Sequence, residues 1–100
     1  MPGDPVCPLC GRPIPEGAKS SRHHLTPKLK GGARMQTVLL HQICHSAIHA
    51  NFSETELAAH FSDIESLRAA PRLQAFLTWV RTKPPAFHAR TFGKLGKGRR

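Results

Sequence analysis

Acidic side chains are scarce in this 100-residue chain, which carries 6 Asp and Glu against 15 Lys and Arg and has a formal charge of +9. Tyrosine is absent, tryptophan occurs once, and no apolar run approaches the roughly 18 residues that a membrane span requires. No N-terminal stretch has the apolar character of a secretory signal peptide. The length suits a single domain rather than a two-domain enzyme. We therefore expect a small, soluble, cytoplasmic protein that does not bind membranes.

The three cysteines cannot all pair with one another, so a disulfide framework does not explain them. A chain of this size has a modest core and often needs a metal or disulfides to stabilise its fold. Cys7-x2-Cys10 and His41-x2-Cys44 form two pairs of ligands, each able to contact one ion from a single turn. Three thiolates and one imidazole make a closed tetrahedral shell that favours structural Zn²⁺. Taken alone, Cys7 and Cys10 would also suit a redox pair.

A second group of histidines lies in the same half of the chain. His45 and His49 are four residues apart, so a helix would place both on one face, where they can hold a metal ion. His23 and His24 are neighbours, and a strand would point them to opposite faces. One of the two can then bind the ion while the other faces the substrate. Each histidine alone has a structural interpretation, but a module that only binds zinc does not need all four.

Acidic residues are missing from the stretch between Glu16 and Glu54. This gap argues against a two-metal site built from carboxylates, so imidazoles would have to do the chemistry. Three imidazoles around one divalent ion leave positions open for water and substrate, as catalytic sites require. A further neutral imidazole, with an ordinary pKa of about 6.5, can take a proton from attacking water.

Hydrophobic periodicity and turn residues predict short elements in the first half. Residues 19–26 are compatible with a strand that ends before a proline, and the apolar run over 37–40 predicts a second, buried strand. Apolar side chains at helical spacing predict a helix over 42–50. The expected order is therefore strand, strand, helix.

Capping motifs and apolar spacing predict helices in the second half of the chain. Two S-x-x-E capping boxes, beginning at Ser53 and Ser62, indicate helices near 54–61 and 63–70. Pro71 suits the first turn of a third helix, whose apolar residues recur at i, i+3, i+4 and i+7. We expect this apolar stripe to pack on the core.

These elements predict an α+β fold in one domain over residues 1–82. Its small core, at about 19–50, would be held by a structural zinc, and a helical extension over 53–82 would add two or three short helices. Residues 83–100 would form a basic, flexible C-terminal arm, because 81–100 holds seven Lys and Arg and no acid. This clustering of charge indicates a nucleic-acid partner.

In combination, the motifs resemble the HNH endonuclease superfamily in its small bacterial, zinc-stapled type. The segments that carry the resemblance are Cys7-Pro-Leu-Cys10, Arg22-His-His-Leu-Thr-Pro27, Gly31-Gly32, Val38-Leu-Leu-His-Gln-Ile-Cys-His-Ser-Ala-Ile-His49 and Phe52-Ser-Glu-Thr-Glu-Leu57. The resemblance implies a ββα-metal core and metal-dependent hydrolysis of DNA phosphodiester bonds. Position by position, it implies His24 as the general base. It implies that one catalytic divalent ion (Mn²⁺, Mg²⁺, Co²⁺, Ni²⁺ or Zn²⁺) is held by His23, His45 and His49.

The sequence departs from the family pattern in the ligands and in the middle Asn of the name motif. The chain's one Asn is Asn51, beyond the last motif His, and Gln36 or Thr37 stands near the expected place on the second strand. The usual second CxxC is replaced by His41-x2-Cys44. His23 stands where many relatives have a carboxylate. A neutral shell of three imidazoles favours Mn, Co, Ni or Zn over Mg.

Basic residues flank the expected base and the Gly-Gly turn: Arg22, Lys28, Lys30 and Arg34. We expect them to contact DNA phosphates, which positions the nucleic acid without reading its sequence; the alternative is a solvated basic loop. No base-reading helix is evident, so a separate DNA-reading partner would have to supply any strong sequence preference. No feature of the sequence indicates an oligomeric state.

Two other functions fit part of the pattern. A non-catalytic, zinc-bound nucleic-acid-binding module would use the charge and the cysteines but not His24. A basic adaptor for an acidic protein would use only the charge and the helical second half. Substitution of His24 separates the nuclease from the binding module, because only the nuclease needs a proton acceptor there.

Overall fold

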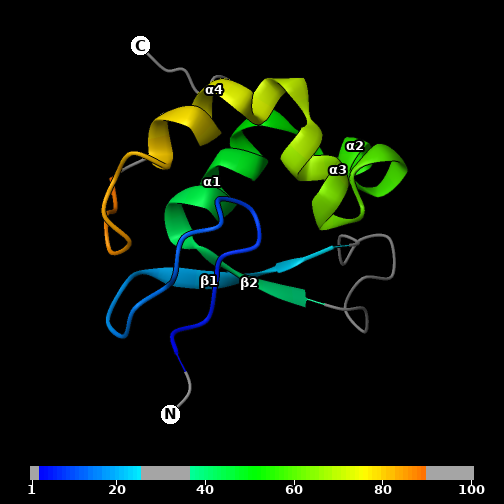
Figure 1. The fold of residues 1–100 in the computed structure, drawn as a ribbon. Coiled ribbons are helices and arrows are strands. Elements are labelled where there is room, and N and C mark those ends of the chain that lie inside the picture. The colour runs from blue at the N-terminus through cyan, green and yellow to red at the C-terminus, as the bar shows by residue number, and fades with distance from the viewer. Residues whose placement is uncertain (1–2, 26–36, 90–100) are drawn as a thin grey trace.

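The computed structural model describes residues 3–25 and 37–89 of the chain (Figure 1). Two antiparallel strands are followed by four helices: β1 (Ser20–His24), β2 (Thr37–His41), α1 (Gln42–Asn51), α2 (Glu54–His60), α3 (Ile64–Ala69) and α4 (Pro71–Val80). In Figure 1 the helices gather on one side of the two strands. The predicted α+β class and the order strand, strand, helix are confirmed, and three helices follow α1. Within the two described ranges, no helix is long and apolar enough to cross a membrane.

The register of the two strands decides which side chains face α1. Ser20 pairs with His41, and His24 pairs with Thr37. Because side chains alternate along a strand, Ser21 and His23 point to one face and Arg22 to the other. His23 is buried and Arg22 is exposed, which matches this alternation. The buried face of β1 is therefore the one against which α1 packs.

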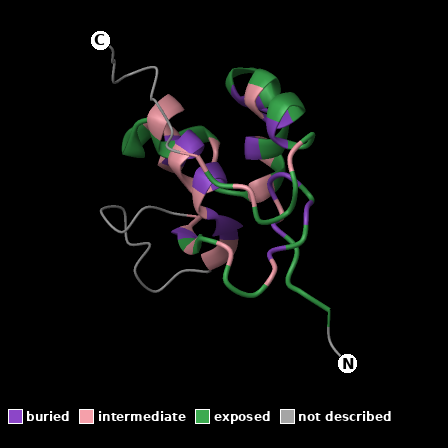
Figure 2. Ribbon diagram, turned by 90° about the vertical axis from the view of Figure 1, so that its left-hand side faces the viewer, coloured by how far each residue is buried: buried purple, intermediate pink, exposed green. Residues whose placement is uncertain are grey.

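Helix α1 continues directly from β2, because His41 both ends the strand and caps the helix. Its buried residues are Ile43, Cys44, Ala47 and Ile48, the helical face that the apolar spacing predicts. They share one core with the buried residues of α4, which are Leu73, Leu77 and Val80. Figure 2 shows buried, intermediate and exposed positions mixed along the helices. The predicted stripe on α4 is thus part of the core.

The caps of the two short helices differ from each other. Ser53 and Glu56 form the predicted capping box at the start of α2. The capping box predicted at Ser62 is wrong, because α3 begins one residue later than expected. Its N-cap is Asp63, whose carboxylate accepts hydrogen bonds from the backbone N–H of Ser66 at 3.3 Å and from its hydroxyl at 2.6 Å. A charged carboxylate at the N-cap also interacts favourably with the helix dipole.

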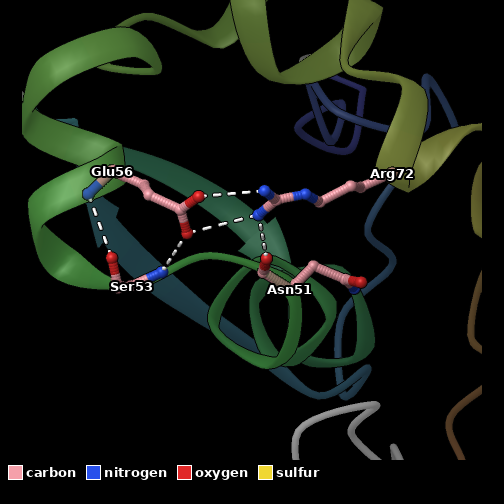
Figure 3. Close-up of polar contacts among 4 residues, drawn as sticks. All are labelled: Asn51, Ser53, Glu56 and Arg72. Carbon is pink, nitrogen blue, oxygen red and sulfur yellow. Dashed lines mark hydrogen bonds and ion pairs between the residues drawn. The ribbon is translucent and has the colours of Figure 1, made fainter.

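An arginine on α4 connects three helices (Figure 3). The two ends of the Arg72 guanidinium donate to the two carboxylate oxygens of Glu56, at 3.2 and 2.9 Å, and one also donates to the carbonyl of Asn51 at 2.7 Å. The Arg72 guanidinium carbon also lies 5.0 Å from the centre of the Phe52 ring. These contacts fix the turn between α1 and α2, and this turn leads into the first residue of α2, Glu54.

The stretch that follows α4 packs back on the domain. Phe87 and Ala89 contact the hydrophobic core, and Arg12 and His41 form hydrogen bonds with backbone carbonyls between Lys83 and Pro85. The first part of the predicted arm, residues 83–89, therefore lies against the N-terminal half. The remainder of the predicted arm, 90–100, lies outside the described residues.

Candidate functional site

The structure brings the four predicted zinc ligands together from three elements. Cys7 and Cys10 come from the N-terminal loop, His41 ends β2, and Cys44 lies in the first turn of α1. All four side chains are buried, and one ligand atom of each lies within 4.8 Å of the others. None of the cysteines is in a disulfide. A buried Cys3His cluster of this kind is compatible with a structural zinc ion.

The turn between the first two cysteines is held by backbone hydrogen bonds. The N–H of Gly11 donates to the carbonyl of Cys7 at 2.8 Å, and the N–H of Cys7 donates to the carbonyl of Arg12 at 3.0 Å. Gly11 has a φ of +84°, a conformation that side chains disfavour, and a Cβ built there meets nothing within 4 Å. The glycine after the second cysteine is therefore required by the backbone conformation and not by lack of space.

His41 has one ring nitrogen available for a metal. Its Nε2 lies 2.7 Å from the carbonyl oxygen of Pro85 and 3.1 Å from that of Pro13. Because carbonyl oxygens only accept, Nε2 must carry the proton, which leaves the lone pair on Nδ1. Nδ1 lies 3.4 Å from the sulfur of Cys10 and so faces the cluster. Such a backbone contact fixes the tautomer and orientation of a ligating histidine.

The three thiols do not titrate alike. The pKa of Cys10 lies well below its usual value, because the thiols of Cys44 and Cys7 donate hydrogen bonds to it and Arg12 adds further donors. The pKa values of Cys7 and Cys44 are raised, first by their hydrogen bonds to Cys10 and further by burial. Three buried thiols so close together do not all ionise without a cation beside them. A divalent ion that prefers thiolates meets this need.

A second cluster lies where β1 faces α1. His23 from the strand meets His45 and His49 from the helix, and one nitrogen of each lies within 4.8 Å of the others. The ring centres are 4.9 to 5.4 Å apart. The spacing of four residues on α1 and the inward face of β1 bring these three side chains together, as the sequence predicts. We call this group the three-histidine cluster.

His23 is buried without hydrogen bonds. It is 1% exposed, and neither ring nitrogen has a partner among the described residues. Burial, and then the nearby His45, His49 and His24, lower its pKa to about 4. The ring is therefore neutral near pH 7 and keeps a lone pair. An unpaired buried polar group costs about 1–3 kcal/mol. Coordination of a metal ion would satisfy one of the two nitrogens, so the donor set fits a transition metal.

The other two histidines are also adapted to hold a metal. Nδ1 of His45 lies 2.6 Å from the hydroxyl of Ser21, which leaves Nε2 for an ion. Burial lowers the pKa of His45, and the charges of His49 and His24 lower it further. Burial also lowers the pKa of His49, although the carboxylate of Glu54 partly opposes this. Lowered pKa values keep all three imidazoles available as neutral ligands.

A cavity of about 180 Å³ opens beside the three-histidine cluster, and most of the described site residues line it. Its lining is formed by Arg22, His23, His24, His45, His49, Glu54 and Leu57. His24 and Arg22, which the sequence predicts as the general base and a phosphate contact, thus face the same space as the candidate metal ligands. The four ligands of the Cys3His cluster are absent from this lining, so the cavity and that cluster are separate sites.

Two polar residues of this site were not predicted. Ser21 holds His45, and its signal in the sequence is that it lies two residues before His23 and so shares the inner face of β1. Glu54 lines the cavity from the first turn of α2. The sequence hint was that it is the first acid after the acid-free stretch and lies five residues beyond His49.

The predicted basic loop is described only at its start. Lys28, Lys30, Arg34 and Gln36 lie outside the described residues. Arg22 is exposed on β1, and its guanidinium donates to the hydroxyl of Thr37 at 3.4 Å. Thr37 pairs with His24 across the two strands. Of the two candidates for the middle residue of the motif, Thr37 is thus placed beside the expected base.

Comparison with known proteins gives one informative relative. No family model and no solved structure matches the chain. "Uncharacterized protein YisB" of Bacillus subtilis (strain 168) is 40% identical over 80 residues, which cover 80% of this chain and 77% of YisB. The chain belongs to the YisB family. Because the matched residues span most of both chains, membership of the YisB family rests on the domain as a whole and not on the cysteine and histidine motifs alone.

Proposed function

We propose that this member of the YisB family is a metal-dependent endonuclease of the HNH type, which hydrolyses phosphodiester bonds in DNA. The observation that carries the proposal is the cavity in which three convergent imidazoles, a fourth histidine and an exposed arginine meet. The net charge of +9 supports a polyanionic substrate. The resemblance of residues 7–57 to HNH nucleases implies a role for each of the four histidines, and the charge and position of Arg22 suit a phosphate contact.

The Cys3His cluster supports the proposal of a structural zinc. Its four ligands are buried and close together, and they come in pairs from the N-terminal loop and from the junction of β2 and α1. An ion there would tie these two segments to each other. Such a shell has no open position for water or substrate. We therefore assign this ion to the fold and not to the reaction.

The proposed reaction uses the cavity. His23, His45 and His49 would hold one divalent ion, which when bound polarises the scissile phosphate and offsets negative charge on the leaving oxygen. His24 accepts a proton from the attacking water, whose oxygen forms the new bond to phosphorus as the bond to the leaving oxygen breaks. Arg22 contacts a neighbouring phosphate and holds the backbone in place. Ser21 keeps the His45 ring in its ligating orientation.

The chemistry of the donor set supports a transition metal in this role. All three ligands are neutral imidazoles, which suit Zn, Co and Ni better than Mg. Glu54 supplies the one carboxylate in the cavity lining. We expect cleavage to be faster with Mn²⁺, Co²⁺ or Ni²⁺ than with Mg²⁺.

Nicking of supercoiled plasmid tests the proposal. The protein is stripped of its metals, reloaded with one equivalent of zinc, and assayed with each of the five candidate ions. We expect His24→Ala to lower the rate by about 10²- to 10⁴-fold, the usual contribution of a general base. His88→Ala is the matched control, because His88 is exposed and does not line the cavity.

Two outcomes decide between this function and its main rival. A non-catalytic nucleic-acid-binding module would bind the plasmid as tightly after His24→Ala as before. It would not nick the plasmid with any of the five ions. If the wild-type protein nicks no faster than His24→Ala with any of the five metals, the nuclease assignment is lost.

A further inference from the structure

Arg12 lies between the Cys3His cluster and the stretch that follows α4. On one side, its backbone N–H and its Nε lie 3.4 and 3.3 Å from the sulfur of Cys10, to which both donate. On the other side, its Nη1 donates to the carbonyl of Pro84 at 2.6 Å and to that of Lys83 at 3.3 Å. One side chain thus joins a candidate zinc ligand to a segment more than 70 residues away.

Two further contacts run between the same partners. Nε2 of His41 donates to the carbonyl of Pro85 at 2.7 Å, and Nε of Arg81 donates to the carbonyl of Cys10 at 3.2 Å. Two of the four candidate zinc ligands are therefore oriented by the segment 81–87, which we call the C-terminal strap.

The burial of Arg12 indicates that it balances charge. The residue is 8% exposed, and among the described residues it forms no ion pair with a carboxylate. Its Nη2 is buried and has no hydrogen-bond partner in the described part of the chain. A buried cation without a counter-charge is costly. Three thiolates around a divalent cation leave one negative charge, which the guanidinium would offset.

We propose that Arg12 couples the Cys3His cluster to the C-terminal strap, so that zinc binding and docking of the strap stabilise each other. The inference rests on the zinc proposed above for this cluster. Arg12 is a positioning residue in this scheme, since it acts on the ion through Cys10. Because the coupling is reciprocal, complete undocking of the strap must weaken zinc binding by the same factor by which loss of zinc weakens docking.

A tryptophan beside the strap can serve as a probe of its docking. Phe87 packs on the core and lies 5.7 Å from the ring centre of Trp79, the chain's one tryptophan. The ammonium of Lys83 lies 5.2 Å from the Trp79 ring and 5.5 Å from the Phe87 ring. Trp79 fluorescence therefore reports whether the strap is docked, with no change to the chain.

The test measures zinc affinity in the full-length protein by competition with a chromogenic chelator, while Trp79 emission is followed during zinc titration. Arg12→Met should weaken zinc binding by about 10- to 100-fold, the usual cost of losing a partner of a metal ligand. Arg12→Lys keeps the charge but not the fork of donors and should give an intermediate loss. Phe87→Ala, which removes no ligand, should weaken zinc binding at least about 5-fold. Arg68→Met is the control, because it removes the same charge from an exposed position.

The outcomes separate the coupling from the zinc site itself. With the wild-type chain and with Arg68→Met, zinc should shift Trp79 emission to shorter wavelength as the strap docks. In Arg12→Met that shift should need more zinc, and far-UV circular dichroism at saturating zinc checks that each variant folds. If the wild-type chain took up no zinc, the zinc assignment would fail and the coupling with it. If all variants bound zinc as tightly as Arg68→Met, the zinc would stand and the coupling alone would be overturned.

Discussion

Replacement of His23 by phenylalanine should change the stability of the protein in opposite directions with and without the second metal ion. The His23 ring is 1% exposed, and its two nitrogens have no hydrogen-bond partner among the described residues. A phenylalanine ring fills nearly the same space without polar atoms. Relief of the unpaired group should raise the free energy of unfolding by about 1–3 kcal/mol in protein that carries only zinc.

The second metal should reverse this order. An ion that binds only the folded protein, supplied at 1,000 times its dissociation constant, adds about 4.1 kcal/mol to the stability of the wild-type chain, which exceeds the gain of about 1–3 kcal/mol from phenylalanine. His23→Phe has lost one of the three imidazoles and should gain much less. Urea unfolding, followed by far-UV circular dichroism with and without Mn²⁺, measures both effects. Mn²⁺ suits this experiment because thiolate sites do not favour it.

The control and the contrary result are both clear. His88→Phe makes the same exchange at an exposed position and should change neither value. If His23→Phe were less stable than the wild-type chain before Mn²⁺ is added, the His23 nitrogens would not be unpaired in solution. If the wild-type chain gained no more from Mn²⁺ than His23→Phe, the three-histidine cluster would not be a metal site.

Three further predictions concern the contacts around the two sites. Ser21→Ala should weaken binding of the second metal about 10- to 100-fold, because the hydroxyl holds Nδ1 of His45, whereas Ser21→Thr should retain the affinity. Isothermal titration calorimetry measures these affinities, and equal values for the wild-type chain and both variants would contradict the prediction. Removal of zinc by a strong chelator should unfold the domain, because zinc binding contributes about 10–16 kcal/mol to the folding of zinc-finger peptides. An unchanged circular dichroism spectrum would refute the structural role. Glu56→Gln should lower the melting temperature by a constant amount between about pH 5 and 8. Hydrogen bonds from Arg72 lower the pKa of Glu56 to about 2, so the stabilisation is present in full above the unfolded pKa of about 4.3 and is lost progressively as the pH falls from there through 2; a difference that shrank between pH 8 and 5 would rule this out.

The parts of the fold that follow from short-range patterns could be predicted from the sequence. The helical face of α1 follows from apolar spacing, and the cap of α2 follows from Ser53 and Glu56, which are three residues apart. The Cys3His cluster could also be predicted, because each of its halves is a local pair three residues apart and a closed zinc shell needs both. The error at α3 has the same local origin. Ser62 and Asp63 are both good caps, and the helix begins after Asp63, whose carboxylate accepts two hydrogen bonds from Ser66.

The supporting contacts of the two sites could not be predicted, because they join residues that are distant in the chain. Ser21 and His45 are 24 residues apart, and Arg12 and Pro84 are 72 apart. Ser21 and Arg12 are ordinary polar residues with no pattern of their own, and the acceptor of Arg12 is a backbone carbonyl that any sequence would supply. Metal ligands can be recognised in the sequence by residue type and spacing. The groups that orient those ligands can be recognised only by their positions in the folded chain. We therefore expect a variant that keeps every cysteine and histidine but alters Ser21 or Arg12 to bind the two proposed metal ions poorly.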